Sequence, residues 1–115
     1  MNPTDLKLIR MKRAINTLLA DIKNHRSFPA TVDKIIVFGS VLTDEFNEYS
    51  DMDICIVYIA EPDEKQKHGI ENYFNDILQK EMNVDFTYCT DDTLKSGQQV
   101  FKSIREKGRV LYERI

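Results

Sequence analysis

Short runs of apolar, β-branched residues alternate along this chain with segments of helical periodicity, and this alternation limits the fold more than any other feature. The runs are too short for helices and predict strands at 34–38, 51–59, 84–88 and 109–112. Between the second and third runs, apolar residues recur at i, i+3, i+4, i+7 and i+8, namely Ile70, Tyr73, Phe74, Ile77 and Leu78. That spacing predicts an amphipathic helix that opens at Pro62. The expected fold is therefore α/β (α+β), a small mixed β-sheet flanked by helices.

The two ends of the chain extend this pattern. A broad apolar stripe from Leu6 to Ile22 predicts a long first helix over 4–24. A short helix over 41–46 would follow the first strand. Near the other end, Thr90 or Asp91 is suited to cap one final helix, which Gly108 ends.

Length, charge and cysteine content narrow the class of protein. The chain has 115 residues, which favours one domain over 1–115. Its 16 basic and 19 acidic residues give a net charge of −3, which disfavours strong nucleic-acid binding. No apolar run approaches the roughly 18–20 residues of a membrane span, and the N-terminus lacks the apolar stretch of a signal peptide. Cys55 and Cys89 form no CxxC pattern and are expected to be reduced core residues of a cytoplasmic protein.

Two carboxylates open the second predicted strand. Residues i and i+2 of a strand face the same way, about 6–7 Å apart, so Asp51 and Asp53 should lie side by side. Two adjacent like charges are unfavourable unless something compensates them, and a hard cation such as Mg²⁺ suits oxygen ligands. A turn and cap before the strand would also account for this pair.

Gly39 and Ser40 end the preceding strand. A glycine at that point lets the backbone approach a ligand closely, and Ser40 at the start of a helix would expose N–H groups that favour phosphate. A plain helix N-cap explains Ser40 equally well. Together with the two carboxylates, the pair predicts metal-assisted phosphoryl or nucleotidyl transfer.

A third carboxylate, Asp85, lies inside the third predicted strand. Alternation puts it on the opposite face from Val84 and Phe86. Beside Asp51 and Asp53 it would complete the three-carboxylate set of a two-metal centre. An edge-strand acid that faces solvent is the alternative.

These residues resemble the signature of the DNA polymerase β-type nucleotidyltransferase superfamily. Gly39-Ser40, ten further residues and then Asp51-x-Asp53 match its pattern, and the size is similar to that of its minimal members, the MNT proteins. The resemblance implies transfer of a nucleoside monophosphate, AMP from ATP, to a hydroxyl group. It implies that Asp51, Asp53 and Asp85 hold two Mg²⁺ ions and act in catalysis, while Gly39 and Ser40 contact the nucleotide.

The same resemblance implies a partner. Minimal members are commonly paired with a small helical HEPN protein, and in such pairs the nucleotidyltransferase is the antitoxin. Some of these pairs work by adenylylation of a toxin tyrosine. The small size of the chain also suggests a homo-oligomer or a partner that completes the site.

Two positions depart from the family pattern. Many minimal members have a basic residue and a glycine where this chain has Thr43 and Asp44. The triphosphate would then need cations from elsewhere, and the final helix offers Lys95, Lys102 and Arg105, although a solvated helix face explains them more simply.

Two other functions remain open. One is a catalytically weak or inactive binding module that neutralises a HEPN partner by contact, which the departures at Thr43 and Asp44 favour. The other is modification of a small molecule, which larger enzymes of this type achieve with an additional domain.

Overall fold

The computed structural model of the chain describes residues 2–25, 28–42, 46–47, 50–78 and 82–114. The elements are α1 (Pro3–His25), β1 (Val32–Phe38), the short 3-10 helix η1 (Ser40–Leu42), β2 (Met52–Tyr58), α2 (Glu64–Ile77), β3 (Val84–Thr90), α3 (Asp91–Leu94), α4 (Gln99–Lys107) and β4 (Arg109–Glu113). All four predicted strands are present, with bounds that differ from the predicted ones by one or two residues.

The four strands form one mixed sheet in the order β3-β2-β1-β4. β1 pairs antiparallel with both β2 and β4, whereas β2 and β3 run parallel. The parallel pair needs a crossover, and α2 supplies it. The sheet and its flanking helices confirm the predicted α/β fold.

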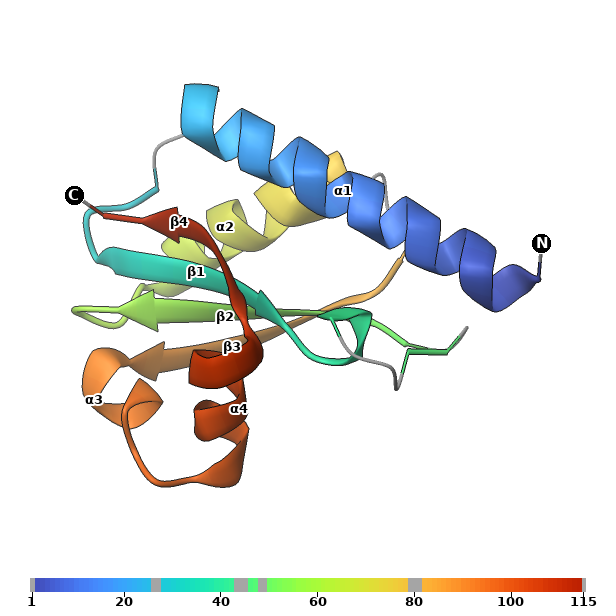
Figure 1. The fold of residues 1–115 in the computed structure, drawn as a ribbon. Coiled ribbons are helices and arrows are strands. Elements are labelled where there is room, and N and C mark those ends of the chain that lie inside the picture. The colour runs from blue at the N-terminus through green and yellow to red at the C-terminus, as the bar shows by residue number, and fades with distance from the viewer. Residues whose placement is uncertain (1, 26–27, 43–45, 48–49, 79–81, 115) are drawn as a thin grey trace.

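The longer helices cover one face of the sheet. In Figure 1, α1 and α2 lie on one side of the strands and α3 and α4 on the other. On the first side, buried residues of α1 recur at helical spacing and meet the inward side chains of the strands; they are Met11, Ile15, Leu18 and Ile22. The predicted stripe was wrong at its start, because Leu6 is 43% exposed. Helical periodicity identifies an apolar face but not where the neighbouring sheet ends.

Helix α2 follows the predicted apolar pattern. Ile70, Tyr73 and Phe74 are buried against the sheet. The helix begins at Glu64, two residues later than Pro62 suggests, because Asp63 is its N-cap and forms a reciprocal capping box with Gln66. Polar residues of α2 line one cleft together with residues of the edge strand β3.

The single final helix was a wrong prediction, since α3 and α4 are separate. Thr90 caps α3 as expected, accepting a hydrogen bond from the Thr93 N–H. Arg105 then donates to the backbone carbonyl oxygens of Leu94 and Ser96. These bonds give partners to carbonyl oxygens at and just after the end of α3, where the helix no longer supplies them.

Gly108 does end α4. A Cβ there would lie 2.4 Å from the Ile104 carbonyl oxygen and 2.6 Å from an Ile36 methyl group. The backbone of Gly108 has a φ of −71°, which any residue can adopt. Glycine is therefore required by the close packing and not by the backbone conformation.

The second face of the sheet has a smaller core. Cys55 and Cys89 are both buried there as free thiols, as predicted for core residues, and their Sγ atoms lie 3.6 Å apart. Ile104 of α4 and Leu94 of α3 cover them. Within the described ranges, no helix is both long and apolar enough to cross a membrane.

Candidate functional site

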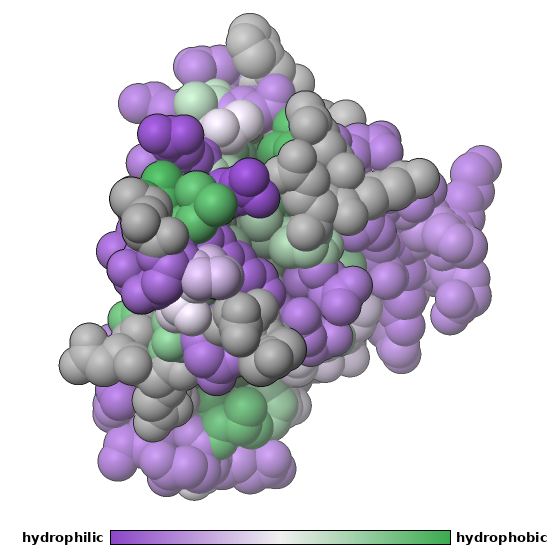
Figure 2. Space-filling view, turned by 90° about the vertical axis from the view of Figure 1, so that its right-hand side faces the viewer, coloured by the Kyte–Doolittle hydropathy of each residue, from purple (hydrophilic) through white to green (hydrophobic). Residues whose placement is uncertain are grey.

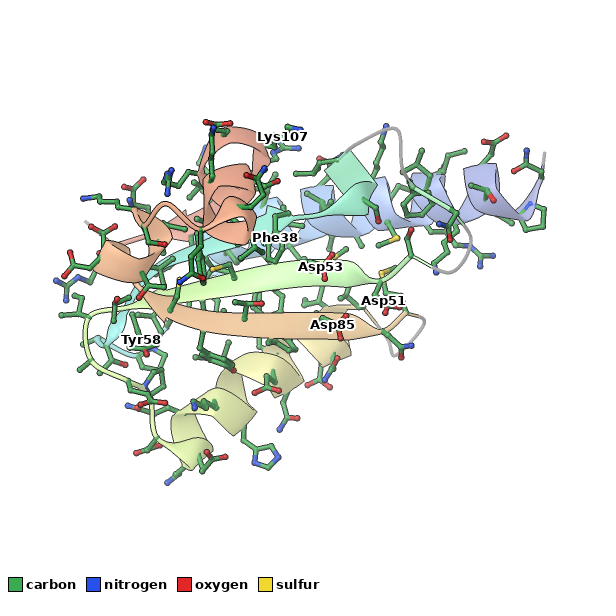
Figure 3. All side chains as sticks on the ribbon, turned by 90° about the horizontal axis from the view of Figure 1, so that it is seen from below. Phe38, Asp51, Asp53, Tyr58, Asp85 and Lys107 are labelled. Atoms are coloured by element: carbon green, nitrogen blue, oxygen red, sulfur yellow. The ribbon has the colours of Figure 1, made fainter. Side chains whose placement is uncertain are left out.

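The sheet register places Asp53 between two other candidate residues. Asp53 is the cross-strand neighbour of Phe38, the residue before Gly39, and of Asp85 on the parallel strand β3. Its sequence neighbours Met52 and Ile54 are fully buried on the other face, as strand alternation requires. Figure 3 shows Asp53 and Asp85 on adjacent strands, towards the same end of the sheet.

Asp51 lies immediately before β2, beside this pair. The Met52 N–H donates to the Asn83 carbonyl oxygen at 3.1 Å, which ties the start of β2 to the start of β3. On the other side, a turn closed by the Ser50 N–H and the Asn47 carbonyl oxygen at 3.0 Å leads into Asp51. A turn before the strand was the alternative explanation for the Asp51 and Asp53 pair, and a turn is present. Asp51 nevertheless lies at the same end of the sheet as Asp53 and Asp85 (Figure 3).

Gly39 has a backbone that other residues rarely adopt. Its φ is +91°, in the left-handed region. A Cβ built on it would lie 2.2 Å from Oδ2 of Asp53, far inside van der Waals contact. Glycine therefore allows the chain to turn directly against the Asp53 carboxylate, which links the Gly39-Ser40 and Asp51-x-Asp53 parts of the sequence pattern physically.

The Asp53 carboxyl is in an unfavourable place for a negative charge. Burial, followed by the charges of Asp85 and Asp51, raises its pKa from 3.8 to about 6. Asp85 itself is exposed on the edge strand β3, as its alternative interpretation expected. It nevertheless lies close enough to Asp53 to affect its ionisation.

The three carboxylates suit a hard cation in their chemistry. Carboxylate oxygens are the ligands that Mg²⁺ prefers, and a cation would relieve the charge interactions that Asp53 experiences. Among the described residues, no three histidine, cysteine, aspartate or glutamate side chains already surround a point where a metal ion would sit. The carboxylates are thus neighbours whose side chains have not converged on one point.

The segment after Gly39 differs from the predicted one. Ser40 begins the three-residue helix η1, closed by a hydrogen bond from the Leu42 N–H to the Gly39 carbonyl oxygen at 3.1 Å. Ser40 is therefore inside the turn, and the expectation that it caps a helix over 41–46 was wrong where the chain is described. Residues 43–45, and with them the departures at Thr43 and Asp44, lie outside the described residues.

The three candidate cations on the C-terminal helices have other surroundings. Lys95 pairs with Asp91 at 2.7 Å, one helical turn away. Arg105 binds the carbonyl oxygens between α3 and α4. Lys102 is exposed on α4. All three are exposed, as the simpler explanation of a solvated helix face expects, and Arg105 in addition holds the end of α3 near α4.

A cleft of about 720 Å³ opens from the carboxylates towards α2. Its described lining consists of Asp51, Asn72, Asn75, Asp76, Met82, Asn83, Val84 and Asp85. We call it the α2–β3 cleft. The α2 residues were not among the predicted site residues, although Asn72, Asn75 and Asp76 recur at i, i+3 and i+4, the same spacing as the buried stripe.

The surface around this end of the sheet is mainly polar. Figure 2 looks onto the side of the molecule that contains the beginnings of β2 and β3, and hydrophilic residues dominate it, with small hydrophobic patches between them. Polar groups that converge on a cleft beside a carboxyl group of raised pKa mark a candidate binding site.

Comparison with protein families gives one match. The family model described as a nucleotidyltransferase domain matches residues 16–112, a span that contains Gly39, Ser40 and all three carboxylates. Among curated proteins, none matches the sequence significantly.

Several solved structures have a similar fold. A candidate nucleotidyltransferase from Sulfolobus solfataricus superposes with a TM-score of 0.56 and 18% identity, covering 99% of this chain and 90% of its own. A toxin–antitoxin structure with AMP-PNP gives 0.54 and 18%, covering 87% and 73%. A tri-AMPylated HEPN toxin of Shewanella oneidensis in complex with its MNT antitoxin gives 0.50 and 18%, covering 90% and 72%. At these identities the likeness is one of fold.

Proposed function

We propose that this chain, which belongs to the nucleotidyltransferase domain family, transfers AMP from ATP to a hydroxyl group of a partner protein in a Mg²⁺-dependent reaction. Residues 1–115 would form a single minimal nucleotidyltransferase domain. The observation that carries the proposal is the juxtaposition of three groups: the Gly39 backbone, the Asp53 carboxylate against it, and Asp85 beside Asp53.

Each group has a role in this reaction. Asp51, Asp53 and Asp85 would hold two Mg²⁺ ions, which when bound would neutralise phosphate charge and favour the deprotonated acceptor. The Gly39-Ser40 backbone would contact the triphosphate, because the absence of a Cβ at Gly39 leaves room for close approach.

The covalent step is a displacement at the α-phosphorus. The acceptor oxygen forms the new bond to the α-phosphorus with a lone pair, and the bond from that phosphorus to the oxygen bridging to the β-phosphorus breaks. Pyrophosphate leaves with the electron pair of that bond. The proton of the acceptor hydroxyl passes to Asp85 and then to solvent.

The partner would be a small helical protein of the HEPN type, and this chain would act as its antitoxin. Support comes from structures of similar fold, one of which is an MNT antitoxin bound to an AMPylated HEPN toxin and another a toxin–antitoxin with AMP-PNP. The match to the nucleotidyltransferase domain family supports the transfer reaction. The α2–β3 cleft has space for an acceptor beside Asp85.

The test is transfer of label from α-³²P-ATP to the helical protein encoded beside this chain. We expect label on the partner with Mg²⁺ and none with EDTA or with the Asp53→Asn variant. The matched control is Asp92→Asn, which removes an exposed acid on α3 and should leave transfer unchanged.

The alternative outcome is equally informative. If the partner is bound and neutralised by both the native chain and Asp53→Asn, with no label transferred by either, the chain is a binding module that acts by contact. That result would contradict the transfer proposal and leave the family assignment intact.

A further inference from the structure

The α2–β3 cleft has a defined position relative to the candidate nucleotide-binding residues. It begins at Asp51 and Asp85 and extends to Asn72, Asn75 and Asp76 on α2. Gly39 and Ser40 are not among its lining residues, and they follow β1, on the opposite side of β2 from β3. The carboxylates therefore separate two regions, one beside β1 and one beside β3 (Figure 3).

Displacement at phosphorus gives these two regions different uses. The attacking and leaving oxygens lie roughly in line, on opposite sides of the phosphorus. If the triphosphate contacts Gly39 and Ser40, the acceptor must approach from the side of Asp85. The cleft is the described space on that side that is large enough for an acceptor side chain and its neighbours, at about 720 Å³.

The acidic and amide residues that line the cleft favour an occupant that is neutral or positively charged. It contains three carboxylates and three primary amides, and none of its described lining residues is a lysine, arginine or histidine. An anionic acceptor such as the end of an RNA would meet like charge there. Asp51 and Asp85 would be engaged in the proposed reaction, which leaves Asp76 as the carboxylate that faces the acceptor.

The amides suit a polypeptide. Asn72 and Asn75 lie on α2, and Asn83 lies at the start of β3 on the other wall. Each primary amide offers donors and an acceptor, which is the complement of a peptide backbone. Asn72 and Asp76 are one helical turn apart and line the same wall.

We propose that the α2–β3 cleft binds the acceptor, that this acceptor is a protein segment whose reacting hydroxyl is flanked by arginine or lysine, and that Asp76 is the residue that selects for positive charge. This inference rests on the proposed function, because it concerns the acceptor side of the same reaction. It assigns to α2 a specificity role in addition to its packing.

The test compares two synthetic peptides as AMP acceptors. Each has a single tyrosine, flanked by arginines in one peptide and by glutamates in the other, and transfer is measured from α-³²P-ATP with Mg²⁺. The native chain should prefer the arginine peptide in kcat/KM by about two- to fivefold, the scale of one exposed charge pair. Asp76→Lys should remove or reverse that preference, whereas the matched control Asp92→Lys should keep it.

On the same variants, the shift in thermal midpoint measures the binding of ATP with Mg²⁺. If ATP binds to the native chain but Asp76→Lys keeps the arginine preference, or neither peptide is labelled, the acceptor inference is overturned and the nucleotide site stands. If ATP does not bind, the proposed function fails and the inference fails with it. A hydroxylated polyamine labelled in preference to the arginine peptide would replace the protein segment by a small cation and overturn that part of the inference.

Discussion

The two faces of the sheet differ in how they are covered and in what they contain. Helices α1 and α2 close the first face over a continuous apolar core that includes Phe74, Met11 and Ile54, all fully buried. The second face is covered by the short helices α3 and α4 around a smaller cluster (Figure 1). The candidate carboxylates lie beyond that cluster, towards the beginnings of β2 and β3 (Figure 3). The larger apolar core is thus concentrated on one face, whereas the carboxylates that we propose to act in catalysis lie on the other.

The difference has a physical cause. An ionised carboxylate is unfavourable in an apolar layer, so Asp53 and Asp85 can lie on the sheet only where helices leave it uncovered. Even there the negative charge is disfavoured at Asp53, where burial and two neighbouring charges raise the pKa to about 6. The first face buries no charged group among the described residues, because its buried side chains there are all hydrophobic.

The largest expected effect comes from truncating the first core. Phe74→Ala removes a fully buried ring that contacts Phe28, Tyr73 and Phe86, and should lower the free energy of unfolding by about 3–5 kcal/mol. Phe101→Ala is the counterpart on the second face, where the ring is only partly buried, and should cost about 1–2 kcal/mol. Urea denaturation measures both, and equal losses would contradict the division between the faces.

Gly39→Ala should damage the site and the fold together. The left-handed φ costs a non-glycine residue about 1–2 kcal/mol, and the new Cβ would displace the Asp53 carboxylate. We expect that loss of stability and a loss of AMP transfer. Gly97→Ala is the control, because a Cβ there meets nothing within 4 Å. Retained transfer by Gly39→Ala would show that the close contact with Asp53 is not required.

Asp53→Asn should make the protein more stable at neutral pH while it removes transfer. Because the folded-state pKa is raised above 3.8, the stability that Asp53 contributes is complete below about pH 4 and is lost as the pH rises through about 6. The amide removes that loss, so the variant should gain about 1–2 kcal/mol at pH 7.5 without Mg²⁺, after allowance for solvent screening. At pH 4 the two proteins should unfold alike. A gain that is the same at both pH values would contradict this assignment.

Gly69→Ala has the smallest expected effect, and its sign is opposite to that of Gly39→Ala. Gly69 lies inside α2, and a Cβ there meets nothing within 4 Å. Alanine should stabilise the helix by about 0.5–1 kcal/mol with AMP transfer unchanged. Thermal unfolding measures the gain, and a destabilised variant would show that α2 needs the freedom of glycine.

Local patterns in the sequence predicted most of the elements and the sides of the strands. Alternation along β2 placed Met52 in the core and Asp53 on the opposite face, and the same rule placed Asp85 correctly opposite Phe86. The exposed Leu6 and the break between α3 and α4 depend on long-range contacts, since the ends of the sheet and the Arg105 hydrogen bonds are not local.

The strand order and the cleft also could not be predicted from local sequence patterns. Pairing of β2 with β3 sets Asp53 beside Asp85, and no pattern within either strand specifies that register. Asp76 joins the cleft only because the α2 crossover brings its polar face to the edge strand. The candidate carboxylates could therefore be selected from the sequence, whereas their surroundings required the fold.

The most direct test of the central claim is the thermal midpoint of the native chain titrated with ATP, with and without Mg²⁺. A ligand that binds only the folded state adds about 2.7 kcal/mol of stability at about 100 times its Kd, which is a shift of several degrees. We expect a shift that requires Mg²⁺ and ATP together, is absent in Asp53→Asn and persists in Asp92→Asn. A shift that survives without Mg²⁺, or that Asp53→Asn retains in full, would contradict a carboxylate-bound metal and nucleotide site.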